Sequence, residues 1–381
     1  MTTTTQPTHH CGILDTVGKQ GFLRSGGYLP SPCDPRVPAQ VIHRHGLRRG
    51  DLLEGLANEP RPGARGERTP ELAHVERING LDPETVAGRP HFAGLTPLHP
   101  QERLRLETEQ SRLDTRLIDI VSPIGKGQRG LLVAPPKTGK TVLLQGVAQA
   151  LTRNHPECRL MVVLLDERPE EVTDMRRTVD AEVISSTFDR PAAEHTAVAE
   201  LAVERAKRLV ELGEDVVILL DSITRLCRAH NTIASGGGRT LSGGVDASAV
   251  HAPKRLFGAA RNIENGGSLT ILATALVQTG SRADDYFFEE LKSTGNMELH
   301  LDRSLADRRV FPAVAVASSG TRKEELLTGP QELVAVRALR RVLSGREVQQ
   351  STELLLSRLR RTGDNNEFLR RVLQDQLPGA A

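Results

Sequence analysis

The sequence of 381 residues contains no tryptophan, and aromatic residues make up only 3% of it. Any surface that stacks nucleic-acid bases on aromatic rings must therefore be small. The four cysteines lie far apart, and none belongs to a Cys-x-x-Cys pair of the kind that binds zinc or exchanges disulfides. The cysteines thus give no sign of a zinc or redox site.

An excess of one charge sign and a long apolar run are absent as well. The 50 Lys and Arg residues face 48 Asp and Glu residues, which gives a net charge of +2. A nucleic-acid contact must then be local rather than spread over the whole molecule. No window approaches the roughly 18 apolar residues of a membrane span, and the opening MTTTTQPTHH is unlike a secretion signal. We expect a cytoplasmic protein with no membrane partner.

The chain is longer than one typical domain, and its texture changes along its length. Residues 12–80 carry short apolar bursts between turn residues, which predicts a small β-barrel behind a disordered tail over 1–11. Four prolines indicate a connector over 81–115. Over 116–381, apolar runs such as RLMVVLLD alternate with helical patterns. This alternation predicts an α/β domain with a buried, mainly parallel sheet and helices at its C-terminal end.

A phosphate-binding loop is predicted at residues 134–141, APPKTGKT, which follow the strand-like GLLV and precede the helical VLLQGVAQAL. Such a loop directs backbone N–H groups at phosphate, while a Lys meets the outer phosphates and a hydroxyl meets Mg²⁺. Lys140 and Thr141 supply these last two groups. The match is imperfect, because Ala134 replaces the usual Gly and two prolines remove backbone donors. The alternative, a chance Gly-Lys-Thr at a helix start, does not explain the acidic residues downstream.

Acidic residues end two of the apolar runs, with Asp166 and Glu167 after RLMVVLL and Asp221 after DVVILL. The carboxyl ends of neighbouring parallel strands are where a doubly wound sheet binds its ligand. Asp221 suits a role at Mg²⁺, directly or one shell away, and Glu167 is placed to orient or deprotonate an attacking water. Either carboxylate alone is equally typical of a strand-terminal turn, but their joint occurrence favours a site.

Two arginines late in the chain are candidates for an arginine finger, a cation that one subunit inserts into its neighbour's site. They are Arg309 in DRRVFPAV and Arg322 in SSGTRKEELL. A finger contributes about 10³ to 10⁵ in rate, because it neutralises charge that develops in the transition state. The alternative for either residue is a solvated surface arginine.

Long blocks of the sequence closely resemble the family of the bacterial transcription termination factor Rho. They are RGLLVAPPKTGKTVLLQ, LLDERPEEVTDM, VILLDSITRLCRAHN, LSGGVDASAVHAPKRLFGAARNIENGGSLTILATALVQTGSR, STGNMELHLDRSLADRRVFPA and SGTRKEELL. The resemblance runs from about residue 12 to the C-terminus and is strongest over 117–327. Blocks of this length are far more specific than a phosphate-loop motif alone.

The resemblance implies a homohexameric ring whose subunits each carry an N-terminal OB-type, cold-shock-like barrel and a RecA-like P-loop ATPase domain. Rho-like proteins bind nascent single-stranded RNA, hydrolyse ATP with Mg²⁺ and dislodge RNA polymerase, with or without an elongation factor. The implied nucleotide residues are Lys137, Thr138, Gly139, Lys140, Thr141 and Val142 at the loop, Glu167 at the attacking water with Arg168 beside it, Asp221 with Thr141 at Mg²⁺, Phe311 at adenine, and Arg322 as the finger supported by Arg309.

The same resemblance places two Gly-rich loops in the central pore of the ring. ASGGGRTLSGG carries Arg239, Thr240 and Gly243, and TGSRADD carries Arg282. Single cations in flexible backbone contact phosphodiesters irrespective of base sequence, so they can hold RNA and release it at each step. The alternative for GGGR is a flexible loop with no such role.

The barrel departs from the family pattern. Its matches to the family's RNA-contacting residues are Phe22, Arg24, Asp34 and Glu67. Lys19-Gln20-Gly21 stands where Gly-Phe-Gly is usual, and Arg36 and Thr69 stand where tyrosines are usual. Phe22 and Tyr28 are the only aromatic residues before position 80. Because stacking residues are missing, we expect the RNA-loading site to be reduced. A short Thr-rich segment also stands where the family carries a helical extension.

Three functions stay open at this point. The first is an RNA-dependent ATPase that terminates transcription, which the filled positions Lys140, Glu167 and Asp221 favour. The second is a divergent relative that binds RNA or joins mixed rings as a regulatory subunit, which the reduced barrel favours. The third is another ring ATPase of the same fold, such as a rotary ATP synthase subunit or a secretion ATPase. That class does not share the pore-loop residues around Gly243 and Arg282.

We predict weak, salt-sensitive RNA loading with little preference for pyrimidines. Each base stacked on an aromatic ring contributes on the order of 1–3 kcal/mol, so the missing rings weaken loading by about one or more factors of ten. Binding of cytidine-rich and adenine-rich oligomers can be measured as salt is raised. Similar affinities that fall steeply with salt are expected, whereas tight, salt-resistant cytidine binding would contradict the prediction.

Overall fold

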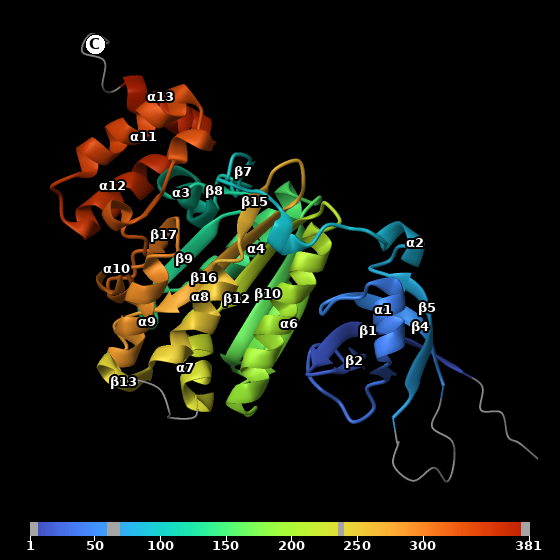
Figure 1. The fold of residues 1–381 in the computed structure, drawn as a ribbon. Coiled ribbons are helices and arrows are strands. Elements are labelled where there is room, and N and C mark those ends of the chain that lie inside the picture. The colour runs from blue at the N-terminus through green and yellow to red at the C-terminus, as the bar shows by residue number, and fades with distance from the viewer. Residues whose placement is uncertain (1–6, 59–68, 235–239, 375–381) are drawn as a thin grey trace, which may run out of the picture.

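The N-terminal strands close into a barrel in the computed structural model, which describes residues 7–58, 69–234 and 240–374 (Figure 1). Its strand order is β1-β2-β3-β5-β4. Leu14, Leu23, Leu53 and Leu72, one from each of four strands, are fully buried inside it. The small barrel predicted from the sequence is confirmed. The elements are β1 (Thr8–Val17), β2 (Gln20–Arg24), β3 (Arg36–Val37), α1 (Ala39–His45), β4 (Leu52–Asn58) and β5 (Glu71–Ile78).

Short elements follow the barrel, and one of them, α2, packs on the barrel through Val86. β7 pairs with β8, and β6 joins the large sheet through β15. Pro83 occupies the first turn of α2, a position where its missing N–H costs no hydrogen bond. These elements are α2 (Pro83–Val86), η1 (Phe92–Gly94), β6 (Pro97–Leu98), β7 (Arg103–Leu104), α3 (Leu113–Val121) and β8 (Ile124–Gly125).

The second domain is built on a sheet with the strand order β11-β10-β12-β16-β9-β17-β18. Neighbours from β11 to β17 run parallel, whereas β18 and the branch strand β15 pair antiparallel. The predicted mainly parallel sheet is therefore confirmed. The strands are β9 (Arg129–Ala134), β10 (Arg159–Glu167), β11 (Glu182–Thr187), β12 (Asp215–Asp221), β15 (Arg261–Ile263), β16 (Ser268–Leu276), β17 (Met297–His300) and β18 (Gly320–Thr321).

Helices cover both faces of this sheet. Alternate residues of a strand point to opposite faces, so Leu132 and Leu164 pack in one core while Leu131 and Val163 pack in the other. Burial on both sides explains why these strands read as unbroken apolar runs. With α3, the helices α4 (Lys140–Asn154) and α5 (Pro169–Thr178) contribute to the first core. The second core takes residues of α6 (Ala192–Val210), α7 (Ile223–Ile233), α8 (His251–Phe257) and α9 (Arg282–Lys292).

The remaining elements form a hairpin and a C-terminal helical group at the end of the molecule away from the barrel (Figure 1). The fully buried Arg116 ties α3 to this group by donating to the carbonyls of Leu359 and Thr362 at 3.1 and 3.0 Å. None of the described helices combines the length and apolar composition needed to pass through a lipid bilayer. The elements are β13 (Thr240–Leu241), η2 (Ser242–Gly244), β14 (Val245–Asp246), η3 (Ala247–Val250), α10 (Arg303–Asp307), η4 (Val316–Ser318), η5 (Glu324–Leu326), α11 (Pro330–Leu343), α12 (Val348–Arg360) and α13 (Asn365–Gln374).

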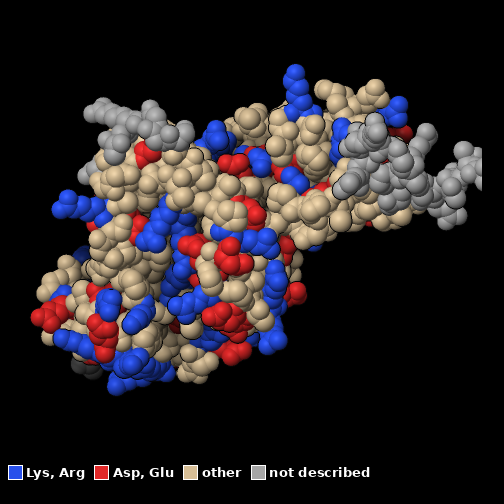
Figure 2. Space-filling view, turned by 90° about the horizontal axis from the view of Figure 1, so that it is seen from below, with Lys and Arg blue, Asp and Glu red and all other residues tan. Residues whose placement is uncertain are grey.

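A buried ion cluster joins the barrel to the second domain. The carboxylate of Glu211, just after α6, is fully buried and accepts a hydrogen bond from Arg48 at 2.8 Å. It also forms ion pairs with Arg89 at 3.2 Å and Arg208 at 3.0 Å. Close packing accompanies it, because a Cβ at Gly50 (φ +93°) would overlap the backbone of Glu204. Elsewhere on the surface, basic and acidic side chains are interspersed, as Figure 2 shows for one face. Basic and acidic side chains are thus mixed on that face, as they are in the sequence as a whole.

Loss of the Glu211 carboxylate is expected to destabilise the protein strongly. Glu211→Ala removes the buried carboxylate that Arg48, Arg89 and Arg208 share, and removing one partner of a buried ion pair costs about 3–5 kcal/mol. The matched control, Glu214→Ala, removes an exposed ion pair with Arg159 and should cost no more than about 1 kcal/mol. Urea unfolding followed by circular dichroism measures both. Equal unfolding midpoints for the two variants would contradict a structural role for the cluster.

Candidate functional site

The predicted phosphate loop connects β9 to α4. Lys137 (φ 66°) and Gly139 (φ 88°) adopt the left-handed conformation, and the hydroxyl of Thr138 donates to the carbonyl of Pro135 at 2.7 Å. Gly139 caps α4 without a side-chain hydrogen bond. The first N–H groups of a helix have no intrahelical acceptor, so this helix end can bind an anion. The loop thus leads from a strand into a helix N-terminus, as the imperfect sequence motif predicted.

Three charged side chains meet behind this loop. The ammonium of Lys140 lies 3.1 Å from Glu167 Oε1 and 2.5 Å from Asp221 Oδ1. Both carboxylates are about 3% exposed and come from the adjacent parallel strands β10 and β12. Thr274 on β16 donates its hydroxyl to the same Oδ1 of Asp221 at 2.7 Å. The structure therefore brings the predicted loop lysine and both predicted acids into one cluster.

Arg225, which the sequence analysis missed, completes the environment of Glu167. Its Nη1 lies 2.7 Å from Glu167 Oε1 and donates to the carbonyl of Asp166 at 2.6 Å. It stands in the first turn of α7, where its N–H also bonds to the Ser222 hydroxyl at 3.2 Å. The only sequence signal was its position four residues after Asp221, at the start of a helix that leaves the same edge of the sheet.

The charge of Glu167 follows from these neighbours. Burial acts to raise the pKa of its carboxyl, but Lys140 and Arg225 outweigh burial and hold the pKa below its usual value. A register shift in β10 places Asp166 at φ 55° between Leu165 and Glu167. The bulge leaves Asp166 partly exposed while Glu167 points inward. Glu167 is thus an anionic acceptor held in one orientation.

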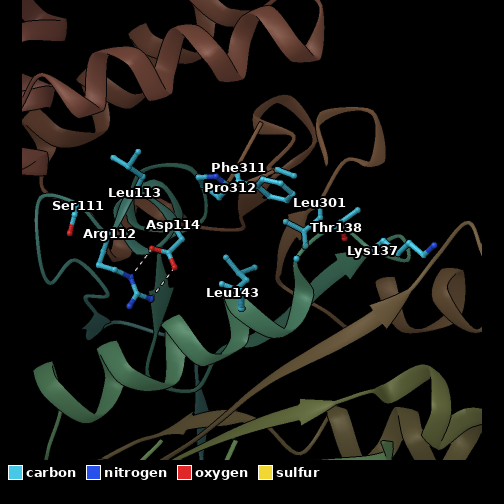
Figure 3. A pocket seen from close by; sticks show the side chains of 13 residues that line it. Ser111, Arg112, Leu113, Asp114, Lys137, Thr138, Leu143, Leu301, Phe311 and Pro312 are labelled. Atoms are coloured by element: carbon cyan, nitrogen blue, oxygen red, sulfur yellow. Dashed lines mark hydrogen bonds and ion pairs between the residues drawn. The ribbon is translucent and has the colours of Figure 1, made fainter. Parts of the chain in front are cut away.

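A cavity of about 590 Å³ opens beside the loop (Figure 3). Lys137 and Thr138 line one end, and Val142 and Phe311 add apolar surface. Phe311 is 43% exposed, and a Cβ at Gly139 would lie 3.6 Å from its ring. A flat ring beside an anion-binding loop is an arrangement that can hold a nucleotide base and its phosphates together.

The three remaining arginines expected near the nucleotide lie outside the Lys140 cluster. Arg168 is exposed at the N-cap of α5. Arg309 is exposed with φ 61°, and Arg322 is exposed beside a second cavity of about 440 Å³. Within the described residues, neither Arg309 nor Arg322 lines the pocket of Figure 3. Their surface positions fit side chains that meet a neighbouring subunit.

The two predicted pore loops meet in the structure. Gly243 (φ 77°) packs so closely that a Cβ there would lie 2.8 Å from the backbone of Arg282 and Ala283. Arg282 is exposed at the start of α9. Thr240 begins β13, and Arg239 lies outside the described residues. Glycine is required at 243 both for its backbone conformation and for this contact.

In the barrel, two of the expected RNA-contacting residues are buried against each other. Arg24 Nη1 lies 2.9 Å from Asp34, and its Nη2 lies 2.6 Å from Asp15. The same guanidinium lies 5.2 Å from the centre of the half-buried Phe22 ring. Glu67 lies outside the described residues. Arg24 and Asp34 thus shape the barrel surface, and Phe22 is the half-buried aromatic group that this cluster supports.

Two family models match the chain. The Rho termination factor RNA-binding domain matches residues 10–84, and the nucleotide-binding domain of the ATP synthase alpha/beta family matches residues 114–321. The transcription termination factor Rho of Streptomyces coelicolor is 62% identical over 99% of this chain and 91% of its own length. The chain belongs to the Rho family.

Other Rho proteins are longer than this chain. The Rho of Streptomyces lividans is 62% identical over 94% of this chain, which spans about half (51%) of that protein. The Rho of Mycobacterium bovis is 58% identical over 95% of this chain and 60% of its own length. The family resemblance inferred from the sequence blocks is confirmed by these identities.

The fold is also found in more distant proteins. A type III secretion ATPase structure has a TM-score of 0.62 at 19% identity and covers 83% of this chain and 94% of its own. An ATP synthase subunit from Nanoarcheaum equitans has a TM-score of 0.59 at 14% identity and covers 74% of this chain and 79% of its own. At such identities only the fold is shared. The RecA-like α/β domain with an OB-type barrel is thereby confirmed, and the chain's own family remains Rho.

Proposed function

We propose that this Rho-family chain is one subunit of a homohexameric, RNA-dependent ATPase that pulls on nascent RNA and ends transcription. The observation that carries the proposal is Lys140 Nζ held between Glu167 and Asp221 behind the phosphate loop. Phosphate oxygens entering the loop offer Lys140 a third anionic partner. Glu167 can then accept a hydrogen bond from the attacking water and orient it toward the outer phosphate.

The loop and the pocket would hold the nucleotide at both ends. Backbone N–H groups of residues 137–141 and the Lys140 ammonium bind the phosphates of ATP. Phe311 and the 67% exposed Val142 offer apolar surface to the adenine. Arg168, beside Glu167 in the chain, is available to an outer phosphate or to the neighbouring subunit. Interaction with the charged phosphates and with the flat base together favours a nucleotide over either fragment.

The residues present also fit Mg²⁺. In the described ranges no three His, Cys, Asp or Glu side chains gather to hold a metal on their own. A P-loop site does not need them, because one hydroxyl, one carboxylate and the phosphates suffice. Thr141 in the first turn of α4 and Asp221, oriented by Thr274, would hold the ion. Mg²⁺ would neutralise the phosphate charge that grows during the reaction.

Contacts between subunits would complete the site. Arg322 is proposed as the arginine finger for the neighbour's nucleotide, with Arg309 in support, since both side chains are exposed. The adjoining loops with Gly243 and Arg282, together with Arg239 and Thr240, would grip the RNA phosphates in the pore. The further partners proposed are RNA polymerase and an elongation factor, and the proposed location is the cytoplasm.

A second candidate, a regulatory subunit that binds RNA without turning over ATP, is favoured by one observation. Arg24 and Asp34 are buried and paired with each other and Tyr28 is buried, so the described residues of the barrel present little beyond Phe22 for bases to stack on. The complete charge cluster around Lys140 favours the ATPase instead. The two candidates differ in whether ATP is hydrolysed.

ATP turnover with and without polycytidylate tests the proposal. We expect RNA to stimulate hydrolysis and Glu167→Ala to abolish it, because the water then loses its anionic acceptor. The matched control is Glu214→Ala, which removes a partly exposed carboxylate just before β12, at the opposite end of that strand from Asp221, and should leave turnover unchanged. Hydrolysis that ignores every RNA would refute an RNA motor, and RNA binding without hydrolysis would support the regulatory subunit.

A further inference from the structure

An ion pair at the far end of the nucleotide pocket has no role in the mechanism above. Arg112 and Asp114 line the cavity of Figure 3 at the end opposite Lys137. Arg112 Nε donates to Asp114 Oδ1 at 3.2 Å, and Arg112 Nη2 donates to Asp114 Oδ2 at 3.0 Å. The Asp114 side chain is 17% exposed and the Arg112 side chain 33%. A charged pair therefore forms one wall of an otherwise largely apolar pocket.

The pair is held in place from several sides. Arg112 Nη1 donates to Gln149 Oε1 on α4 at 2.9 Å. Asp114 lies in the first turn of α3, where the helix dipole favours a negative charge. Gly146 on α4 leaves room for both side chains, because a Cβ there would lie 2.6 Å from Asp114 Oδ2. Such support gives the carboxylate a fixed orientation, as a recognition group requires.

The spacing along α4 suits a nucleotide. Phosphates bind at Lys140, and Gly146, which touches Asp114, lies six residues further along the helix, a rise of about 9 Å. Phe311 stands over the pocket between these two ends in Figure 3. A nucleotide with its phosphates at the loop would pass its base under Phe311, and the outer edge of the base would reach Asp114.

We propose that Asp114, oriented by Arg112, accepts a hydrogen bond from the exocyclic amino group of the base and makes the site selective for 6-aminopurine nucleotides. This inference rests on the proposed nucleotide site. A carboxylate only accepts hydrogen bonds, so it attracts an amino group and repels the oxygen of a 6-oxopurine. The residue acts on substrate choice and not on the chemical step.

The bidentate contact from Arg112 also limits which hydrogen-bond donors of a base can reach Asp114. The guanidinium of Arg112 binds both oxygens of Asp114 and occupies one acceptor position on each. The two occupied positions are those that face the guanidinium. The acceptor positions that remain point apart, so one base edge can reach only one of them. Adenine presents a single amino group there, whereas guanine, with two adjacent N–H donors, would leave one of them unmatched.

Affinities for ATP and for purine riboside triphosphate, which lacks only the amino group, test this directly. The wild-type protein should bind ATP about tenfold or more tightly than the analogue, as expected for a hydrogen bond to a charged group. In Asp114→Ala the ratio should fall to about one, because ATP weakens while the analogue does not. Asp114→Asn keeps a hydrogen-bond acceptor without the charge, so its affinity ratio should lie between those of the wild type and Asp114→Ala. GTP and inosine triphosphate should bind the wild type weakly.

The control is Asp174→Ala, which removes an exposed carboxylate that accepts from Gln145 on the outer side of α4. It should leave the ratio of the two affinities unchanged. Equal wild-type affinities for ATP and the analogue, or a ratio that survives in Asp114→Ala, would overturn the inference while leaving the nucleotide site in place. A wild-type protein that binds no nucleotide would overturn both. If Asp114→Ala does not fold, Asp114→Asn and the wild-type comparison still decide.

Discussion

The contact on which the site depends is the ammonium of Lys140 between two buried carboxylates. Burying Glu167 and Asp221 side by side would be costly without a cation between them, because like charges at short range repel and lose their hydration. Lys140 supplies that cation from the first residue of α4, and Arg225 supplies a second one to Glu167. The lysine thus connects three elements of the sheet edge, and the same lysine is the group that would meet phosphate. The same lysine therefore stabilises the folded protein and would bind the phosphates of the nucleotide.

Much of this arrangement could be predicted from the sequence, because its signals are local. Apolar runs that end in acids place Glu167 and Asp221 at one edge of a parallel sheet, and the loop before α4 follows from residues in direct succession. Arg225 and Thr274 could not be predicted in the same way, because their contacts depend on the strand order β10-β12-β16. The pairing of Arg24 with Asp34 could not be predicted for a similar reason, because the two residues belong to different segments of a closed barrel.

The position of α7 gives the site a physical connection to the proposed pore. Its first turn carries Arg225 against Glu167, and its last residue, Ile233, leads toward the loop that resumes at β13. Gly243, in that loop, touches the backbone of Arg282. If RNA displaces these loops, as the proposed function implies, α7 connects them to Glu167. At the end of α6, which packs beside α7 on the same face of the sheet, the buried Glu211 cluster fixes the barrel to the second domain. The barrel and the second domain are thus fixed to each other through buried charges.

We propose that Glu167 of one subunit and Arg322 of the next form a single catalytic site. Rings made only of Glu167→Ala chains, or only of Arg322→Ala chains, should hydrolyse almost no ATP. When the two chains are co-expressed in equal amounts, about one quarter of the interfaces would contain both intact residues, given subunit contacts that repeat around a ring. RNA-stimulated ATP turnover of the mixed rings measures this. Partial recovery of turnover is the predicted result, and mixed rings as inactive as either parent would contradict a site shared between subunits.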